Sequence, residues 1–218
     1  MKTEWLRKTI ADFDPYFVAP IAEKHVINAN ENYLNVLTIP GVKEELIQAL
    51  DTFRPQIYPK PMSDDIREAL ADYIGGKAEN FIVGNGGDEI ISLIMNTFLN
   101  PGDTLLTHTP TFDIYGIDAE VLGAKVVTVS DLDGYRRNRD GLLAKVEELQ
   151  PKVTVLCNPN NPTGELLPLD YVESLVQAAD NIVVVDEAYL EFAGAPSIIT
   201  KLAQYDNLIV IRTLSKAF

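Results

Sequence analysis

Short apolar runs alternate along the chain with longer stretches in which apolar residues recur every three or four positions. The runs are rich in β-branched residues and nearly unbroken, as in strands that are buried on both faces of a sheet. They predict strands at Phe81–Val83, Thr104–Thr107, Lys125–Val129, Val153–Cys157, Ile182–Val185 and Leu208–Ile211. The stretches between them predict helices at Asp88–Leu99, Phe112–Leu122, Asp140–Leu149, Leu169–Ala179 and Ile198–Tyr205. This alternation predicts an α/β fold with a mostly parallel sheet covered by helices on both faces.

The region before the first predicted strand has a different pattern. Residues 1–40 contain few signals beyond an extended segment near Val26–Ile27. Periodic apolar positions then predict two helices, Val42–Phe53 and Ser63–Tyr73. Ser63 is expected to cap the second helix, because serine side chains accept a hydrogen bond from the first turn.

Composition narrows the range of functions. The 218 residues carry a formal net charge of −14, which disfavours binding to a nucleic-acid backbone. Cys157 is the only cysteine, so an internal disulfide is excluded and a cytoplasmic location is expected. No ligand spacing typical of a zinc site is present, and no apolar run approaches the length of a membrane span.

Polar or glycine-rich segments follow five of the predicted strands. Ligands of open α/β sheets bind beyond the carboxyl ends of the strands, so these segments are expected to meet in one crevice. They are GNGGDE (84–89), HTPTF (108–112), NPNNPTG (158–164), DEAY (186–189) and RTLSK (212–216).

Each of these segments has a structural and a functional interpretation. The glycines of 84–89 form either a tight turn or an anion site at a helix N-terminus. Asp186 follows a fully apolar run, where a carboxylate must be paired, hydrogen-bonded or protonated. Lys216 is either a solvated surface residue or a desolvated nucleophile. Asn161–Pro162 is a candidate cis peptide bond. A nucleotide-binding domain is disfavoured, because neither phosphate-loop fingerprint is present.

Eight collinear segments together resemble the fold-type-I aminotransferases that depend on pyridoxal 5′-phosphate (PLP), and within them the histidinol-phosphate aminotransferase family. They are DPY (14–16), NANEN (28–32), YPKP (58–61), GNGGDEII (84–91), PTFDIYG (110–116), NPNNPTG (158–164), DEAYLEF (186–192) and RTLSKAF (212–218). The resemblance implies an N-terminal arm with part of a small domain at residues 1–40 and a large PLP-binding domain at residues 41–218.

The resemblance also assigns roles around the cofactor. Lys216 matches the catalytic lysine that holds PLP covalently and moves a proton. Asp186 matches the carboxylate that faces the pyridine nitrogen and keeps it protonated. Tyr189 and Asn161 match the pair that hydrogen-bonds the 3′-oxygen. Phe112 matches the aromatic residue that stacks on the ring, where many relatives have tyrosine.

The cofactor phosphate is expected at the start of the helix that opens with Gly87 and Asp88. Backbone N–H groups would hold it there, so Gly87 keeps its donor although serine or alanine is common at this position. The hydroxyl groups of Thr213 and Ser215 are expected to add two donors.

Three more matches concern the substrate and a second subunit. Tyr58 matches a tyrosine that reaches the phosphate of the neighbouring subunit's cofactor, which implies a homodimer with shared sites. Tyr16 and Asn30 match positions near the substrate. The implied reaction is transamination between L-histidinol phosphate and 2-oxoglutarate. The alternatives are an aromatic amino-acid aminotransferase, a threonine-phosphate decarboxylase and a non-catalytic PLP-binding remnant.

Members of that family continue well past the lysine. They carry a phosphate-clamping arginine, a strand that returns antiparallel into the sheet, and a C-terminal small domain that supplies substrate-binding arginines. We therefore expect these 218 residues to be part of a longer polypeptide or a shortened version of one. As such, the chain should expose a sheet edge and a large apolar face, and have little or no transaminase activity by itself.

Overall fold

The computed structural model describes residues 3–11, 13, 22 and 28–218, so Tyr16 and the expected segment near Val26–Ile27 lie outside the described residues. The strands are β1 (Thr104–Thr109), β2 (Lys125–Ser130), β3 (Val153–Cys157), β4 (Ile182–Asp186) and β5 (Leu208–Ile211). The helices are α1 (Val42–Thr52), α2 (Asp64–Ile74), α3 (Gly87–Phe98), α4 (Ile114–Val121), α5 (Arg139–Leu149), α6 (Leu169–Ala178) and α7 (Leu190–Ala193). Short 3-10 helices lie at Thr3–Trp5, Val36–Thr38, Ala78–Asn80, Asp133–Tyr135 and Ile198–Gln204.

All five strands run parallel, in the order β2-β1-β3-β4-β5. The register places Cys157 beside Asp186, and Asp186 beside Ile211. The carboxyl ends of β3, β4 and β5 therefore lie side by side. This confirms the predicted parallel α/β architecture, with most element boundaries shifted by only one or two residues.

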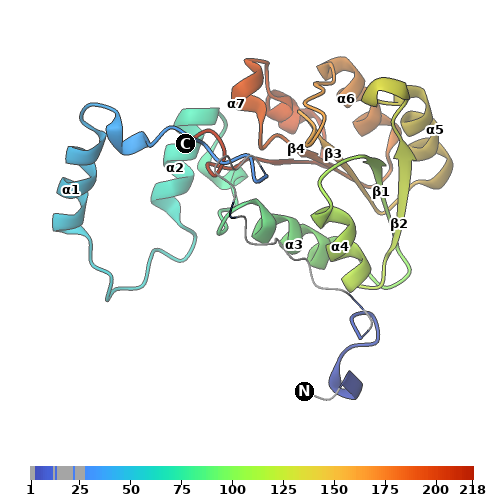
Figure 1. The fold of residues 1–218 in the computed structure, drawn as a ribbon, viewed down its shortest axis with the longest axis horizontal. Coiled ribbons are helices and arrows are strands. Elements are labelled where there is room, and N and C mark those ends of the chain that lie inside the picture. Colours follow the sequence, from blue (N-terminus) through green and yellow to red (C-terminus); the bar gives the residue numbers. More distant parts are fainter. Residues whose placement is uncertain (1–2, 12, 14–21, 23–27) are drawn as a thin grey trace.

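Helices cover both faces of the sheet (Figure 1). One core packs α5, α6 and the 3-10 helix Ile198–Gln204 against side chains such as Leu156 of β3. The other packs α3 and α4 against side chains such as Val155. Because successive side chains of a strand point to opposite faces, neighbouring residues of β3 belong to different cores. We call residues 81–218 the sheet body.

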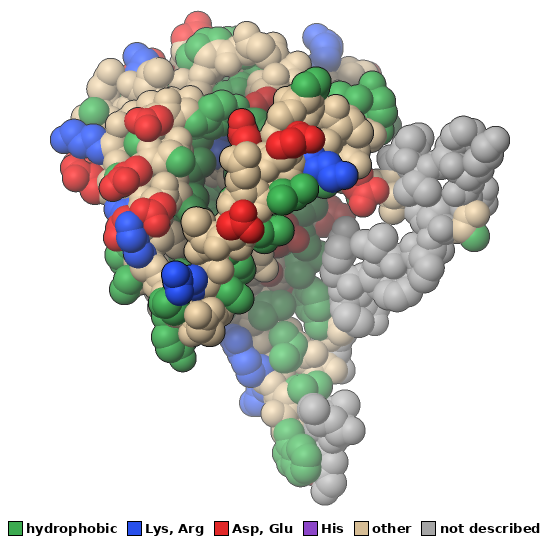
Figure 2. Space-filling view, turned by 90° about the vertical axis from the view of Figure 1, so that its left-hand side faces the viewer, with side chains coloured by type: hydrophobic (Ala, Val, Ile, Leu, Met, Phe, Trp, Pro, Cys, Tyr) green, Lys and Arg blue, Asp and Glu red, His purple; other side chains and the backbone are tan. Residues whose placement is uncertain are grey.

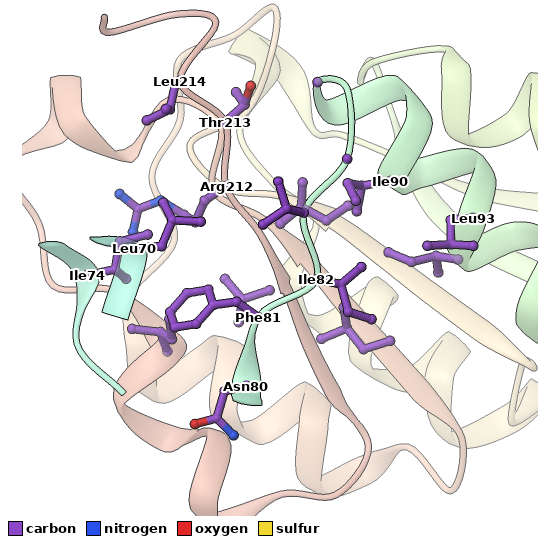
Figure 3. Close-up of a pocket in the computed structure, with 18 of the residues that line it drawn as sticks. Leu70, Ile74, Asn80, Phe81, Ile82, Ile90, Leu93, Arg212, Thr213 and Leu214 are labelled. Atoms are coloured by element: carbon purple, nitrogen blue, oxygen red, sulfur yellow. The ribbon is translucent and has the colours of Figure 1, made fainter. Parts of the chain in front are cut away.

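The strand predicted at Phe81–Val83 is not formed, although Phe81 has an extended backbone. This segment lies across an apolar cavity of about 620 Å³ from β5, the edge strand of the sheet (Figure 3). A strand needs a neighbour that pairs with its N–H and C=O groups, and within the described residues this segment has none. Beside the cavity, Ile82 is largely exposed and Leu93 is about half exposed.

Residues 33–62, which we call the helical extension, project away from the sheet body and contain α1 (Figure 1). No residue of α1 is buried. The next helix, α2, is also without buried residues, but it lines the cavity and places Tyr73 edge-on against Phe218. Ser63 occupies the predicted N-cap position of α2, but its side chain makes no capping hydrogen bond because its backbone is left-handed, with φ of 52°. The domain boundary at residue 40 stays a prediction.

Acidic and basic side chains are interspersed on the face shown in Figure 2, where no continuous basic patch is visible. Among the described residues, no helix combines the length and hydrophobicity that crossing a membrane requires.

Candidate active site

The loops after β3, β4 and β5 meet at the carboxyl edge of the sheet. The backbone N–H of Asn158 donates to Asp186 O at 2.8 Å, and that of Glu187 donates to Ile211 O at 2.9 Å. These bonds continue the sheet ladder by one residue beyond the strands. Three of the five polar segments predicted to share a crevice, 158–164, 186–189 and 212–216, therefore start from adjacent, hydrogen-bonded positions.

Asp186, the last residue of β4, is a buried carboxylate with only 4% of its surface exposed. Its Oδ2 accepts a hydrogen bond from Tyr115 Oη at 2.6 Å, and its Oδ1 accepts one from the N–H of Ala188 at 3.0 Å. Burial raises the pKa of this carboxyl group, the two hydrogen bonds oppose the rise, and the charge of Asp88 adds to it. No Lys or Arg among the described residues forms an ion pair with Asp186, so this carboxylate is suited to a cationic ligand.

Lys216 lies in the turn after β5 and is half-buried. Its Nζ donates to Ala29 O at 3.0 Å. Two further bonds connect residues 28–32 to the same loops, from Asn30 Nδ2 to Tyr189 Oη at 3.2 Å and from Asn32 Nδ2 to Ala217 O at 3.3 Å. The N-terminal segment therefore crosses the carboxyl edge and brings Asn30 to Tyr189 and Ala29 to Lys216.

Two of the three asparagines of 158–164 hold the loop in place through side-chain hydrogen bonds, and the third does not. Asn158 Oδ1 accepts from the N–H of Leu167 at 2.7 Å, and Asn160 Nδ2 donates to Pro110 O at 3.0 Å. Both side chains are buried and hold the loop in place. The side chain of Asn161 makes no hydrogen bond with the residues that the structure describes. It remains available to a ligand, and the peptide bond to Pro162, a candidate for the cis form, is cis.

The glycine-rich segment 84–89 forms a hollow at the start of α3. A Cβ at Gly84 would lie 2.7 Å from Ile90 Cδ1, so a larger residue there would have to displace that side chain. A Cβ at Gly86 or Gly87 would meet nothing within 4 Å, so the space in front of the helix N-terminus is open. The first N–H groups of a helix attract anions, and this opening gives an anion access to them.

The hydroxyl groups of Thr213 and Ser215 lie 2.9 Å apart in the loop after β5. Both residues line the same cavity as Gly84 and Gly86, and Figure 3 shows Thr213 at the end of that cavity near the start of α3. The structure thus brings the start of α3, with Gly87 and Asp88, and the loop with Thr213 and Ser215 to the same cavity.

Phe112 precedes α4 and is partly buried. Its ring contacts Tyr115 edge-on, with the ring centroids 5.7 Å apart. The sequence interpretation missed Tyr115. The signal was its spacing, because residues three apart at the start of a helix lie on the same side. This turn therefore packs the buried Tyr115 behind Phe112.

The sequence interpretation also missed a cluster of charges beneath the loops. Arg212 pairs with Glu191 and lies 3.6 Å from Glu187 Oε2. Glu187 is buried and accepts hydrogen bonds from the Ser197 hydroxyl and the Ile198 N–H. This cluster ties the loop after β5 to the loop after β4, and so positions the segment that carries Lys216 relative to Asp186.

Tyr58 is the described candidate that the fold does not bring to this edge. It lies in the helical extension with 96% of its surface exposed. Tyr16 lies outside the described residues. The other described candidates belong to the loops at the carboxyl edge, to the segment that crosses them, or to the start of α3.

The model of the family described as aminotransferase class I and II matches residues 24–218. The chain belongs to this family. A histidinol-phosphate aminotransferase of Thermoanaerobacter sp. (strain X514) is 37% identical over 213 residues, which are 98% of this chain and 60% of that protein. Histidinol-phosphate aminotransferase 1, chloroplastic, of Arabidopsis thaliana is 39% identical over 191 residues, 87% of this chain and 44% of that protein.

Solved structures of the family have the same fold. The histidinol-phosphate aminotransferase from Sinorhizobium meliloti in complex with pyridoxal-5′-phosphate is 30% identical and matches with a TM-score of 0.73, over 82% of this chain and 49% of that one. A putative histidinol-phosphate aminotransferase from Erwinia carotovora atroseptica matches with a TM-score of 0.77 at 29% identity, over 87% of this chain and 56% of that one. The expected fold type I is confirmed. The chain spans about 60% of the length of the curated relatives from Thermoanaerobacter and Clostridium novyi.

Proposed function

We propose that the natural protein containing this chain is a PLP-dependent aminotransferase that converts L-histidinol phosphate and 2-oxoglutarate to imidazole-acetol phosphate and L-glutamate. The observation that carries the proposal is the buried Asp186, which has no cationic partner among the described residues and lies one strand away from the loop of Lys216. The names of the relatives, at 37% identity over 98% of the chain, support the choice of substrate.

The residues present fit PLP. Asp186 offers a desolvated carboxylate to a protonated pyridine nitrogen, and the open start of α3 offers N–H donors to a phosphate. Asn161 has a side chain without a hydrogen-bond partner among the described residues, and it lies in the loop beside that of Tyr189. These two side chains would hydrogen-bond the 3′-oxygen, and Phe112 would stack on the ring.

When bound, PLP supplies an electron sink that stabilises negative charge at the substrate Cα. Lys216 would hold the cofactor through Nζ and, once released, carry a proton to and from that carbon. The hydroxyl groups of Thr213 and Ser215, with the N–H groups of Gly87 and Asp88, would hold the phosphate. Tyr16 and Asn30 would contact the substrate, and the bond of Asn30 to Tyr189 supports this for Asn30.

The test is a comparison of substrates on the purified natural protein with 2-oxoglutarate as acceptor. L-Histidinol phosphate is expected to give glutamate with a much higher kcat/KM than phenylalanine or tyrosine. Lys216→Ala serves as the control and should abolish turnover. A preference for an aromatic amino acid, or release of carbon dioxide from threonine phosphate, would replace the proposed substrate with an alternative. No turnover and no PLP binding would contradict the proposal altogether.

We also propose that the natural protein is a homodimer. The apolar side chains of α1 support this, because Leu46, Ile47 and Leu50 are each about half exposed and no described segment covers them. Exposed apolar faces of this kind mark protein interfaces. Sedimentation should give a dimer for the natural protein and a shift toward monomer for Leu50→Asp. A monomeric natural protein would contradict the proposal.

In this dimer, Tyr58 would reach the cofactor phosphate of the neighbouring subunit. Mixing the inactive variants Tyr58→Ala and Lys216→Ala tests this directly. A mixed dimer then has one intact site, in which the Tyr58→Ala chain supplies Lys216 and its partner supplies Tyr58. Recovery of activity on mixing is expected. No recovery, with mixed dimers demonstrated, would mean that Tyr58 does not act on the neighbouring site.

The cytoplasm is the proposed location. The free and buried Cys157 is compatible with a reducing compartment. Fractionation of cells with an antibody against the natural protein would test it, and enrichment in a membrane or secreted fraction would contradict it.

A further inference from the structure

Tyr115 is the buried side chain that connects two of the proposed cofactor contacts. It is the second residue of α4, with 1% of its surface exposed. Its hydroxyl group donates to Asp186 Oδ2 at 2.6 Å, which is the length of a charge-assisted bond. Its ring packs edge-on against Phe112. The aromatic residue proposed to stack on the ring and the carboxylate proposed to face its nitrogen are thus held by one residue.

The groups around Asp186 show why its hydrogen bond with Tyr115 matters for the charge of this carboxylate. The titratable groups that face the carboxylate are Tyr115 from α4, Cys157 from β3, Asp88 from α3 and Tyr189 after β4. Burial raises the pKa of Cys157 to about 12, and partial burial raises the pKa of Tyr189, so both stay neutral near pH 7. The charge of Asp88 makes the Asp186 carboxylate more basic. Tyr115 is the one described side chain that donates a hydrogen bond to this carboxylate.

Tyr115 can act only as a donor to Asp186. Burial and the charge of Asp186 raise the pKa of the Tyr115 hydroxyl well above its ordinary value of 10.0, so this hydroxyl keeps its proton. A hydrogen bond to an ionised group stabilises that charged form and lowers its affinity for a proton. The Tyr115 hydroxyl therefore makes Asp186 a weaker base than burial alone would.

We propose that Tyr115 is a positioning residue that keeps Asp186 ionised, so that the proton shared between Asp186 and the cofactor rests on the ring nitrogen. The inference rests on the proposed use of PLP and adds a residue to it. Tyr115 does not touch the reacting atoms. It acts through Asp186, and it links the orientation of this carboxylate to the packing of Phe112.

The test is a pH titration of the absorbance of PLP bound at Lys216, in the natural protein and in Tyr115→Phe. Phenylalanine keeps the ring packing and removes only the hydroxyl group. Asp186 then becomes more basic and the ring nitrogen loses positive charge, so the midpoint of the titration should rise. The rise should be on the order of one pH unit. The free energy of a hydrogen bond to a charged group corresponds to a pKa shift of roughly this size.

Tyr205→Phe is the matched control. Tyr205 Oη also donates to a carboxylate, Glu173 Oε1, at 2.7 Å, but Tyr205 lies just before β5, at the end of the strand opposite to the loop that carries Lys216. The control should leave the midpoint unchanged. Equal midpoints in Tyr115→Phe and the natural protein, with PLP bound in both, would overturn the inference. Failure of the natural protein to bind PLP would instead contradict the proposed function.

A second measurement covers the case in which Tyr115→Phe does not fold. Incorporation of 3-fluorotyrosine at position 115 keeps the hydroxyl group and makes it a stronger donor. The midpoint should then move downward, opposite to the effect of phenylalanine. An unchanged midpoint with fluorotyrosine would overturn the inference.

Discussion

Helices α6 and α1 have similar patterns of apolar residues and opposite surroundings. Both carry apolar residues at spacings of three and four, which gives each helix one apolar side. In α6 this side is buried against the sheet, with Leu175 fully covered. In α1 the corresponding Leu50 is 60% exposed. The difference lies in the partner, because the chain supplies a sheet for α6 and no described surface for α1.

This contrast separates the sheet body, which buries its own apolar side chains, from the helical extension, which needs a partner surface to cover them. The sheet body has its own two cores and carries Asp186, Asn161 and Lys216 on adjacent loops. The helical extension contributes Tyr58 and an uncovered apolar face. Substitutions in the sheet body should therefore affect folding, and those in the extension should affect association.

The largest effect is expected from a buried ion pair in the sheet body. Arg137 Nε lies 2.8 Å from Asp131 Oδ1, and the two side chains are 1% and 2% exposed. Arg137→Leu should lower the free energy of unfolding by about 3–5 kcal/mol, because it leaves the Asp131 charge buried without a partner. The double variant Asp131→Leu/Arg137→Leu should recover most of this loss. Denaturant unfolding measures both, and a single variant as stable as the parent would contradict the assignment.

Leucines of the two helices sharpen the comparison directly. Leu175→Ala in α6 should cost about 2–5 kcal/mol at every protein concentration, because it opens a cavity in the core. Leu50→Ala in α1 should cost little in dilute monomer and appear as weaker dimerisation at higher concentration. Unfolding curves at several concentrations distinguish the two. If both substitutions lowered the free energy of unfolding by a similar amount at every concentration, the distinction between the sheet body and the helical extension would be wrong.

The smallest effect concerns Asp186 in the cofactor-free protein. Burial raises the folded-state pKa of Asp186 above its ordinary value of 3.8, so the unfolded chain loses this proton at a lower pH than the folded chain. Stability from this group is therefore complete below pH 3.8 and falls as the pH rises toward the folded-state pKa. Asp186→Asn should raise the melting temperature at pH 7, and the gain should shrink as the pH is lowered toward 3.8. A variant that is less stable at pH 7 would show that this carboxylate stabilises the fold.

The sequence predicted the sheet body well because its strands and helices are covered by one another. A strand that is buried on both faces, such as Val153–Cys157, can be recognised in the sequence as a continuous apolar run. The strand predicted at Phe81–Val83 was wrong because a strand forms only where a neighbouring strand pairs with it, and no described strand pairs with this segment. For the same reason the role of α1 could not be predicted, because the sequence of an apolar helix face does not show which surface covers it.

The candidate site was predictable where a residue acts through its own chemistry. Asp186 and Lys216 stand out as charges at the ends of apolar strands. Tyr115 and Asn160 do not, because they act through contacts with residues 71 and 50 positions away in the chain. Such contacts become visible only when the fold is known.

The central claim is that the loops of the sheet body form a PLP site with Lys216 as the point of attachment. Borohydride reduction of the natural protein with PLP, followed by digestion and mass spectrometry, tests it most directly. The reduced pyridoxyl phosphate group should be found on Lys216, persist in the control Lys201→Ala and be absent from Lys216→Ala. Attachment to a different lysine, or none at all, would contradict the account.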